Sequence, residues 1–527
     1  MMLVRSAMVV PVSGRLQPSI LDVPRRVTAP LALAATLAEA TPALAGGPLG
    51  ADGTALQTSN YALDLYQGPV FAGSRVTGLA GAYVAVAEDV DGDLQNAATP
   101  AVRPFYSTSY FDYWLGFGLT FPSTLNNVDF FNSGSQTQLA NAPDSFVFFT
   151  PAVNLQWGEL GIGLTIELSR YDLSSQPVEQ QSQGRRSTTE VSIPTVHFQV
   201  AHGFDHNQLV FGIGTRTLSM RAQPSEGGAF NSSGVGLEFG AVYKPETLPI
   251  RAGAGFRTEI RTDAQFTDEL LPDANGDVVV TDNVGSTYYL PESVALPWDL
   301  NLGFAVQLGR PFNPPWREDT ERIERDVLEH RLRQLDRQER AAEAPPGESP
   351  GEAAARRELS EREQGLDDGR LAERMRDAER AAARDQALLS RRYLLISTSL
   401  LISGKLEDAI GVENMVSQVV QRSGRHTVFS PRLGLEGAVL PELLKLRGGS
   451  YIEPTRFETS TARVHGTFGM DIRLVNWNVF GLWPDNYVWR VGLGGDVSRR
   501  YFSWGITIGG WYPRQRREET GLAVGAE

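Results

Sequence analysis

The feature that most constrains this chain is an alternation of apolar with small or polar residues, which recurs from residue 105 onward. In the segment GIGLTIELS, Leu164, Ile166 and Leu168 share one face of an extended strand, whereas Gly163 and Thr165 share the other. A period of two predicts β-strands. The second face mixes glycine with isolated charges, as a crowded barrel interior does, whereas a soluble β-sandwich would show Lys, Thr and Glu there. The sequence therefore predicts an all-β fold, an outer-membrane antiparallel β-barrel.

The alternating segments number about fourteen, and bacterial barrels of this kind have an even number of strands. Eight precede a long charged stretch, within residues 105–310, and six follow it, within residues 391–511. The expected strands span 105–121, 145–156, 160–171, 189–203, 206–221, 232–244, 248–263, 291–308, 391–403, 424–441, 445–458, 462–477, 486–499 and 501–511.

The lengths of the connections predict how the barrel is oriented. If the chain enters the first strand from the periplasm, the connections after odd strands lie outside the cell. These include the long polar stretches 122–144, 172–188, 222–231, 264–290 and 404–423. The connections after even strands include the tight turns GEL, DHN, KPETLP and PELLK. Long external loops and short periplasmic turns are the asymmetry expected of an outer-membrane barrel.

One connection departs from this scheme. Residues 311–390 have no strand character and are rich in Glu, Arg, Ala and Leu, a composition that favours helix. APPGESPGE divides the stretch into two expected helices, and strand parity places this hairpin in the periplasm. Narrow apolar stripes run along both helices: Ile323, Val327, Leu332 and Leu335, then Leu359, Leu366, Leu371, Met375 and Ala382. Two interpretations stay open, a solvated charged insertion and a coiled-coil arm that binds a periplasmic partner at 317–390.

The termini carry their own signals. Arg25 and Arg26 precede the apolar stretch VTAPLALAATLA, and Ala43-Leu44-Ala45 matches a small-x-small cleavage site. We therefore expect residues 1–45 to be a signal peptide; the alternative is an N-terminal extension without order. Residues 46–104 are expected to form a periplasmic segment and a lumen plug, and residues 512–527 a C-terminal tail.

Composition excludes several function classes. The chain has no cysteine, and its formal net charge of −14 disfavours nucleic acid as a partner. In HFQVAHGFDH, His197 and His202 fall on opposite faces of a strand, so we expect no metal site there. No serine and histidine pair as a lipase would need, so we expect neither an enzyme nor a cofactor.

Two acidic stretches keep calcium open as an alternative. In DANGDVVVTD, Asp273, Asn275 and Asp277 alternate as in an oxygen-rich calcium loop, although a hairpin tip at Asn275-Gly276 explains the pattern more simply. EDVDGD (88–93) repeats the same acidic spacing within the expected plug.

The plug segment carries a family resemblance. A glycine-rich stretch, then GAYVAVAED and an asparagine, followed by about fourteen strands, resembles the FadL/TodX family of hydrophobic-compound transporters and is similar to PorV-type barrels of a secretion system. The matching positions are Arg75, Gly78, Gly81, Ala82, Tyr83, Glu88, Asp89 and Asn96. The chain departs from the family pattern at Ala97, where proline would follow the asparagine.

The resemblance implies uptake of a hydrophobic molecule such as a long-chain fatty acid. In this family an N-terminal plug fills the lumen, ligand docks near the external loops, and a break in the wall releases it into the bilayer. It assigns Arg75, Gly78, Gly81, Glu88, Asp89 and Asn96 to the plug, and suggests Phe121, Leu125, Phe130, Phe131, Leu270 and Leu271 as ligand contacts. The alternative is a PorV-like shuttle or assembly platform in the outer membrane.

Overall fold

The fold was analysed in a computed structural model of the chain. The structure describes residues 49–103, 111–122, 129–134, 147–175, 187–224, 230–266, 270–281, 287–313, 318–342, 349–388, 392–441, 443–458, 460–476 and 488–511. The expected signal peptide (1–45) and the C-terminal tail (512–527) therefore lie outside the described residues.

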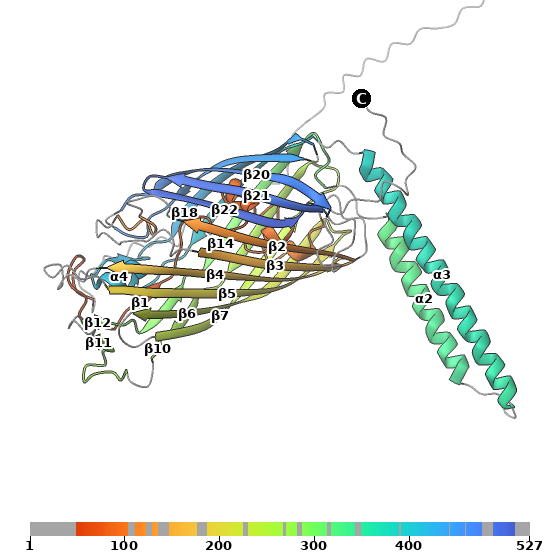
Figure 1. The fold of residues 1–527 in the computed structure, drawn as a ribbon, viewed down its shortest axis with the longest axis horizontal. Helices are drawn as coiled ribbons and strands as arrows, with labels where there is room; N and C mark the ends of the chain where they lie inside the picture. Colours follow the sequence, from red (N-terminus) through yellow and green to blue (C-terminus); the bar gives the residue numbers. More distant parts are fainter. Residues whose placement is uncertain are drawn as a thin grey trace, which may run out of the picture. The chain divides into compact units, whose positions relative to one another are not determined.

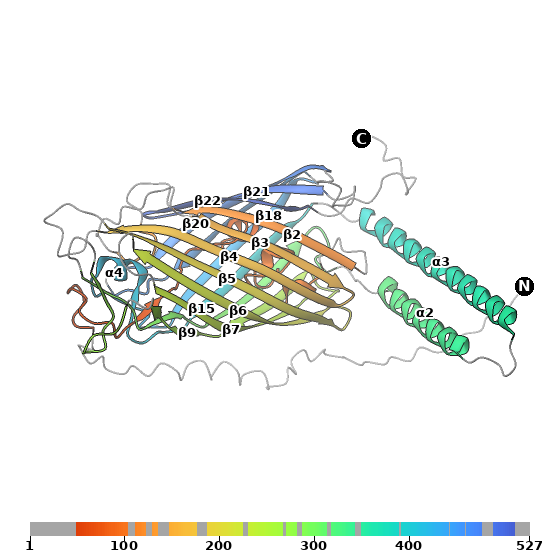
Figure 2. The ribbon, with the colours of Figure 1, turned by 60° about the horizontal axis from the view of Figure 1, so that its bottom comes forward.

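Fourteen antiparallel strands form a closed barrel, which confirms the predicted fold class (Figures 1 and 2). The ring closes where Gly116–Pro122 of the first barrel strand pair with Ser503–Gly509 of the last. The barrel strands are β2 (Phe111–Pro122), β3 (Val147–Trp157), β4 (Leu160–Ser175), β5 (Ser187–Phe204), β6 (Leu209–Pro224), β7 (Phe230–Tyr243), β8 (Ile250–Arg257), β14 (Asp299–Leu308), β15 (Leu394–Ser403), β18 (Val428–Leu440), β19 (Leu444–Glu453), β20 (Arg463–Asn476), β21 (Val488–Ser498) and β22 (Tyr501–Gly510).

The two faces of the wall follow the predicted alternation. In β4, Leu164, Ile166 and Leu168 point outward and are exposed, whereas Gly163 and Thr165 face the lumen and are buried. Aromatic side chains lie on the outer face near the strand ends. Such pairs are Phe111 with Trp157, Phe204 with Phe211, and Phe121 with Trp504. An apolar outer belt bordered by aromatic rings is the surface that a bilayer stabilises.

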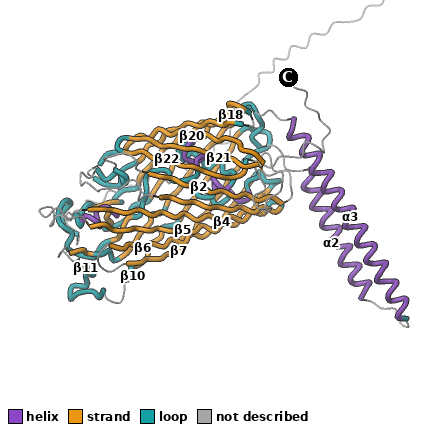
Figure 3. The backbone as a smooth tube through the Cα atoms, viewed as in Figure 1, coloured by secondary structure: helices purple, strands orange, loops and turns teal. Residues whose placement is uncertain are grey.

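The two ends of the barrel differ, and we call them the loop end and the turn end. Long connections follow β2, β4, β8 and β15 at the loop end, where the loops gather in Figure 3. Short turns follow β3, β5, β7 and β18 at the turn end. The last hairpins reverse the expected lengths, because β21 and β22 join at the loop end through Arg499 and Arg500 alone, whereas the β20–β21 connection at the turn end is longer.

A second sheet lies at the loop end. It has five short strands in the order β17-β16-β1-β13-β9. β1 (Ala62–Asp64) pairs in parallel with β13 (Ser293–Leu296) and β16 (Ala409–Gly411), and its outer members are β9 (Ile260–Asp263) and β17 (Arg422–Ser423). The first part of the expected periplasmic segment, residues 49–66, thus lies among the long loops. This differs from the turn-end position that the sequence suggests, because β1 fills a gap between two loop strands.

The insertion between β14 and β15 forms two helices, α2 (Glu318–Ala342) and α3 (Pro350–Leu388), side by side in Figure 1. Arg337 pairs with Asp367 at 2.6 Å, and Arg374 pairs with Asp326 at 2.9 Å, so the helices run antiparallel. Within the described residues, no helix is long and apolar enough to cross a membrane.

Two members of the expected apolar stripe of α2, Leu332 and Leu335, do not face α3. Leu332 is 56% exposed and Leu335 is 52% exposed. With about 100° between successive helix residues, both lie opposite Arg337, which faces α3. Charged side chains instead hold the two helices together, because their long stems reach across the interface.

Candidate functional site

The segment from Gln67 to Arg103 fills the barrel interior. It contains one short helix, α1 (Ser74–Gly78), and two 3-10 turns, Val90–Gly92 and Thr99–Ala101. Residues 81–89 form turns rather than a helix. Ala80, Gly81 and Ala87 have positive φ values of 57°, 73° and 43°, which a right-handed helix does not accommodate.

The plug backbone touches glycines on the inner wall. A Cβ atom on Gly212 of β6 would lie 2.0 Å from the Ala97 carbonyl oxygen, and one on Gly253 of β8 would lie 2.2 Å from that of Val84. On the opposite side, Gly78 of the plug lies close to Gly469 of β20. A Cβ on Gly78 would be 3.0 Å from the Cα of Gly469. The predicted role of Gly78, close packing in a crowded lumen, agrees with this geometry.

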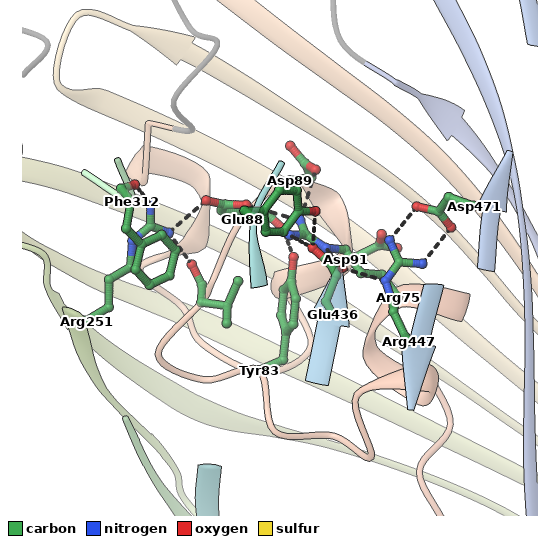
Figure 4. A network of polar contacts seen from close by, with 12 residues as sticks. Arg75, Tyr83, Glu88, Asp89, Asp91, Arg251, Phe312, Glu436, Arg447 and Asp471 are labelled. Atoms are coloured by element: carbon green, nitrogen blue, oxygen red, sulfur yellow. Dashed lines mark hydrogen bonds and ion pairs between the residues drawn. The ribbon is translucent and has the colours of Figure 1, made fainter. Parts of the chain in front are cut away.

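Arg75 anchors the plug to the wall. Its Nε and Nη2 donate to the two carboxylate oxygens of Glu436 on β18 at 2.9 and 3.0 Å, and its Nη1 donates to Glu88 at 3.1 Å. Asp89 lies 3.6 Å from Nη1, and the Tyr83 ring lies 5.3 Å from the guanidinium carbon (Figure 4). Burial lowers the pKa of Arg75, but Glu436 outweighs it, so the pKa lies well above its ordinary value. The resulting pair is bidentate, buried and fully charged.

The ion pairs continue from Arg75 in one direction across the lumen. Glu88 also pairs with Arg251 of β8 at 2.9 Å. Arg251 in turn donates to the carbonyl oxygens of Val86 at 2.8 Å and Phe312 at 3.0 Å. Burial raises the pKa of Glu88, whereas Arg251 and Arg75 lower it, and the net pKa lies below its ordinary value. Glu88 therefore remains an anion between two cations.

In the other direction the chain of charges ends on the plug again. Arg447 of β19 contacts Glu436 and donates to Asp471 of β20 at 2.8 and 2.6 Å. Asp471 also accepts from Arg490 of β21 at 2.7 Å, and Arg490 contacts Asp91 of the plug. Alternating charges thus link plug and wall across five strands, from β8 to β21.

The acidic run at 88–93 is divided among separate partners. Asp89 lies near Arg75 and Asp91 contacts Arg490, whereas Asp93 accepts hydrogen bonds from Asn154 and Thr165, each at 2.9 Å. Because the carboxylates diverge, they form no common calcium site. Burial raises the pKa of Asp93 to about 8, against the two hydrogen bonds that lower it.

Asn96, the last predicted plug residue, fastens two segments. Its Nδ2 donates to the carbonyl oxygens of Val84 at 2.8 Å and of Ala241 in β7 at 3.1 Å, while its Oδ1 accepts from the Ala98 N–H at 3.0 Å. Ala97 is buried beside Gly212. The turn is therefore closed by the asparagine side chain, with alanine at the position where the family pattern has proline.

The second calcium candidate is a turn at the loop end. The Asp273 carboxylate accepts from the backbone N–H groups of Asn275 at 2.7 Å and Asp277 at 3.0 Å, and the Gly276 N–H donates to the Asp273 carbonyl oxygen. Asp277 itself accepts from the Ser59 N–H at 2.6 Å. The carboxylates thus fix the turn. Among the described residues, no group of three or more His, Asp or Glu could hold a metal ion.

The predicted ligand contacts fall in different places. Phe130 is buried and packs on Phe131 at 4.7 Å and on Phe71 of the N-terminal segment at 5.5 Å. Leu270 packs beside the same apolar cluster, but its neighbour Leu271 is 80% exposed.

Phe121, suggested as a ligand contact, belongs to the barrel wall. It lies in β2 on the outward face, stacked on Trp504 at 4.8 Å, and so faces away from the lumen. Leu125 is outside the described residues.

A cavity of about 170 Å³ lies on the loop side of the plug. It is lined by Leu94, Gln95 and the stretch 65–71 except Gly68 of the N-terminal segment, by Leu296 and Pro297, and by inward side chains of β4, β5, β6, β8, β14, β15 and β18. Its lining joins apolar groups such as Leu218 and Ile193 with the guanidinium groups of Arg216 and Arg432. Sequence reasoning missed these two arginines, because alternation places each on the inner face but does not show that they line one cavity.

The wall beside this cavity has a step. β7 pairs with β6 from Phe230 to Tyr243, but with β8 only from Glu238 to Tyr243. β8 ends at Arg257, and the chain turns into the lumen as β9, which pairs with β13. From Ser232 to Leu237, no described barrel strand pairs with this edge of β7, which β10 (Gln265–Phe266) joins only at Phe230 and Asn231. The alternating run 248–263, expected to be one strand, is therefore two.

A few hydrogen bonds cover the step. The Thr258 N–H donates to the Leu237 carbonyl oxygen, and Thr258 Oγ1 accepts from the Leu237 N–H, each at 2.9 Å. Thr262 Oγ1 donates to the Ser233 carbonyl oxygen at 2.8 Å. Ile260 packs behind them on Gly234 and Gly236.

The step is also connected to the cavity. Arg216, which lines the cavity, donates from Nη2 to the Thr258 carbonyl oxygen at 2.9 Å. One hydrogen bond thus joins the lining of the cavity to a residue that covers the step. One sequence signal for the irregular wall was present, because Pro297 interrupts the run 291–308 and proline is disfavoured inside a central strand.

No protein-family model and no curated protein sequence matches the chain. Among solved structures, the chain is similar to the P. putida toluene transporter TodX, with 10% identity, 84% of this chain and 98% of that chain covered, and a TM-score of 0.42. It is likewise similar to the CymD monoaromatic hydrocarbon channel, at 9% identity, 83% and 96% coverage and a TM-score of 0.42. A Pseudomonas aeruginosa FadL homologue gives 10% identity, 87% and 99% coverage and a TM-score of 0.42. Scores this low add nothing to the barrel that the strand pairing establishes.

Proposed function

We propose that this protein lies in the outer membrane of a Gram-negative bacterium and takes up hydrophobic molecules, with a transport rather than a catalytic role. The apolar outer belt suits a bilayer. A plug that charged residues hold in place fills the lumen. A solute therefore cannot cross the barrel through an open, water-filled channel. A long-chain fatty acid or another lipophile is the kind of cargo that fits a route through lipid.

The step at β7 is the observation that carries this proposal. A ligand captured among the loops enters the cavity above the plug, and the plug prevents it from continuing to the turn end. The free edge of β7 then offers a lateral exit to the bilayer, where an apolar solute is more stable than in water. This exit requires the segment from Thr258 to Thr262, which covers the edge, to move away from β7.

A disulfide across the step tests the route. The chain has no native cysteine, and a Cβ on Gly234 would lie 3.2 Å from Thr262 Cβ, near the spacing that a disulfide spans. Gly234→Cys with Thr262→Cys should stop uptake of a lipophile into outer-membrane vesicles under oxidising conditions, and a reductant should restore it.

The matched control bridges a part of the wall that is continuous. Ser219 of β6 and Ser233 of β7 are directly opposed, so Ser219→Cys with Ser233→Cys should leave uptake unchanged. Undiminished uptake by the oxidised Gly234–Thr262 variant, with the disulfide verified by mass spectrometry, would refute the lateral route.

A second candidate function is that of a PorV-like shuttle or assembly platform. The outer face of α2 favours it, because Leu328, Leu332 and Leu335 are spaced i, i+4, i+7 and are more than half exposed. We propose that this face binds a periplasmic protein. Photo-crosslinking from residue 332 should capture one specific partner, whereas residue 336 on the flank should not. A variant without residues 317–390 that keeps full function would contradict this role.

A further inference from the structure

The cavity above the plug holds two buried guanidinium groups without a full set of partners. Arg432 of β18 is 8% exposed and Arg216 of β6 is 3% exposed, and both line the cavity. The Nε–H group of each is buried and has no hydrogen-bond acceptor. An unpaired donor on a buried cation is costly, so such a site favours a ligand that supplies acceptors.

The two arginines contact mainly neutral groups. Arg432 donates from Nη1 to the Gly81 carbonyl oxygen at 3.4 Å and lies 5.9 Å from the Tyr451 ring centroid, and it forms no salt bridge within the described part of the chain. Arg216 donates to the Thr258 carbonyl oxygen and lies 3.9 Å from Asp299. Arg432 therefore has no carboxylate partner in the described part of the chain, and Arg216 has only Asp299, at the outer limit of ion-pair distance.

The acidic residues of the cavity are engaged elsewhere. Asp299 accepts from Arg257 at 2.9 Å, and Glu167 accepts from His197 at 3.0 Å. The lining thus has three arginines and two carboxylates, and both carboxylates already have closer partners. The lining therefore carries a net positive charge, and this charge lies near Arg432 and Arg216.

Size limits what such a site can hold. A cavity of about 150 Å³ accommodates one benzene ring, and this cavity is about 170 Å³. Leu218, Ile193 and Leu94 supply apolar walls beside the two guanidinium groups. The arginine fork matches the two oxygens of a carboxylate.

We infer that the cavity binds a small organic acid of about the size of benzoate, its carboxylate on Arg432 and Arg216 and its apolar body against the leucine and isoleucine side chains. The inference rests on the proposed function, since this site would select the cargo that reaches the step. The Arg216–Thr258 hydrogen bond then couples the bound carboxylate to the cover of the step. The carboxylate of a bound acid would compete with the Thr258 carbonyl oxygen for the guanidinium of Arg216.

Titration calorimetry on the full-length protein in detergent tests the inference with three probes: benzoate, toluene and inorganic phosphate. Benzoate should bind with a saturable isotherm, and toluene, which has the same ring without the carboxylate, should bind at least roughly tenfold more weakly because it leaves the guanidinium donors unpaired. Phosphate should bind weakly, because it leaves the apolar walls uncovered.

Arg432→Gln and Arg216→Gln should each weaken benzoate binding by roughly tenfold to a hundredfold. Arg432→Lys keeps the charge but loses the planar guanidinium group. Its affinity for benzoate should lie between that of the glutamine variants and that of the unmodified protein. The matched control is Arg425→Gln, an arginine at the loop end that contacts Glu458 outside the cavity, and it should not change binding. Should either glutamine variant fail to fold, the benzoate–toluene comparison on the unmodified protein still decides.

Equal binding of toluene and benzoate would overturn the inference, as would phosphate binding that exceeds that of benzoate. The result is distinguishable from a failure of the proposed function. If the Gly234–Thr262 disulfide blocks uptake but benzoate does not bind, only the acid site falls. If benzoate binds and the disulfide leaves uptake unchanged, the acid site stands without the lateral route.

Discussion

The plug and the step in the wall are held in contrasting ways. On the plug, Arg75, Glu88 and Asp91 enter a continuous series of buried ion pairs with five wall strands. At the step, Thr258 and Thr262 form neutral hydrogen bonds to an unpaired strand edge. Breaking one partner of a buried ion pair leaves an uncompensated charge, which costs several times more than a neutral hydrogen bond.

This difference predicts which part of the barrel would move on the proposed lateral route. The plug is fixed to opposite walls at once, so its displacement would expose several charges together. The cover of the step can leave while its few donors and acceptors exchange partners with water or lipid headgroups. The proposed lateral route therefore requires the edge to open while the plug stays in place.

The largest effect is expected from breaking the plug network. Arg75→Ala leaves Glu436 and Glu88 without their shared cation, and should lower the free energy of unfolding by about 3–5 kcal/mol. Urea unfolding in detergent measures this, and planar-bilayer conductance should show a leak as the plug loosens. Arg170→Ala is the control, because its pair with Glu190 is exposed and should contribute less than about 1 kcal/mol. Equal effects of the two substitutions would contradict the anchoring role of Arg75.

A smaller effect is expected from adding one methyl group where the plug meets the wall. Gly212→Ala places a Cβ 2.0 Å from the Ala97 carbonyl oxygen, and such overpacking should cost about 1–3 kcal/mol. Gly448→Ala is a matched control in β19, since the nearest atom to its added Cβ is 3.8 Å away. Thermal unfolding of both variants compares them, and a tolerated Gly212→Ala would show that the plug can shift.

The sequence could predict the glycine contacts as a class but not the ion pairs. Alternation separates inward from outward residues, so Gly212 is recognisable as a lumen residue from its strand alone. Arg75 and Glu436, in contrast, are 361 positions apart, and their meeting depends on the register of every intervening strand. The same holds for Arg216 and Arg432 in the cavity.

The step was also beyond the sequence pattern. Residues 248–263 alternate without interruption, because β9 remains extended and half-buried after it leaves the wall. Periodicity reports an extended chain with two unlike faces, and it does not report which strand lies beside it. Only the pairing of β9 with β13 distinguishes the two arrangements.

At the step itself a moderate effect is expected. Thr258→Val removes the oxygen that accepts the Leu237 N–H, and should weaken local closure by about 1 kcal/mol. Hydrogen exchange at Leu237 should accelerate roughly fivefold, with global unfolding unchanged. Thr398→Val, which removes a hydroxyl on the outer face of β15, is the control. Unchanged exchange at Leu237 would mean that Thr258 does not hold the edge.

The smallest effect is a pH dependence at the loop end. Glu413, in α4 (Val412–Ser417), accepts from Ser133 Oγ at 2.9 Å, and burial, with the Asp129 carboxylate nearby, raises its pKa to about 8. The folded state therefore binds a proton that the unfolded chain releases near its ordinary pKa of about 4.3. The contribution of Glu413 to stability is full below that value and is lost as pH rises through about 8.

Hydrogen exchange of residues 129–134 should accordingly become faster as the pH rises from about 4.3 to about 8, beyond the intrinsic rise in exchange chemistry, with no further change from Glu413 above that pH. Glu413→Gln keeps an acceptor for Ser133 without the titration, and should make protection independent of pH across this range. Glu407 is an exposed glutamate of the same loop. Glu407→Gln should leave the pH dependence of hydrogen exchange at residues 129–134 as it is in the unmodified protein. The step is expected to respond less, because Thr258 and Thr262 do not titrate; a pH slope at Leu237 equal to that at Ser133 would show that the two regions open together.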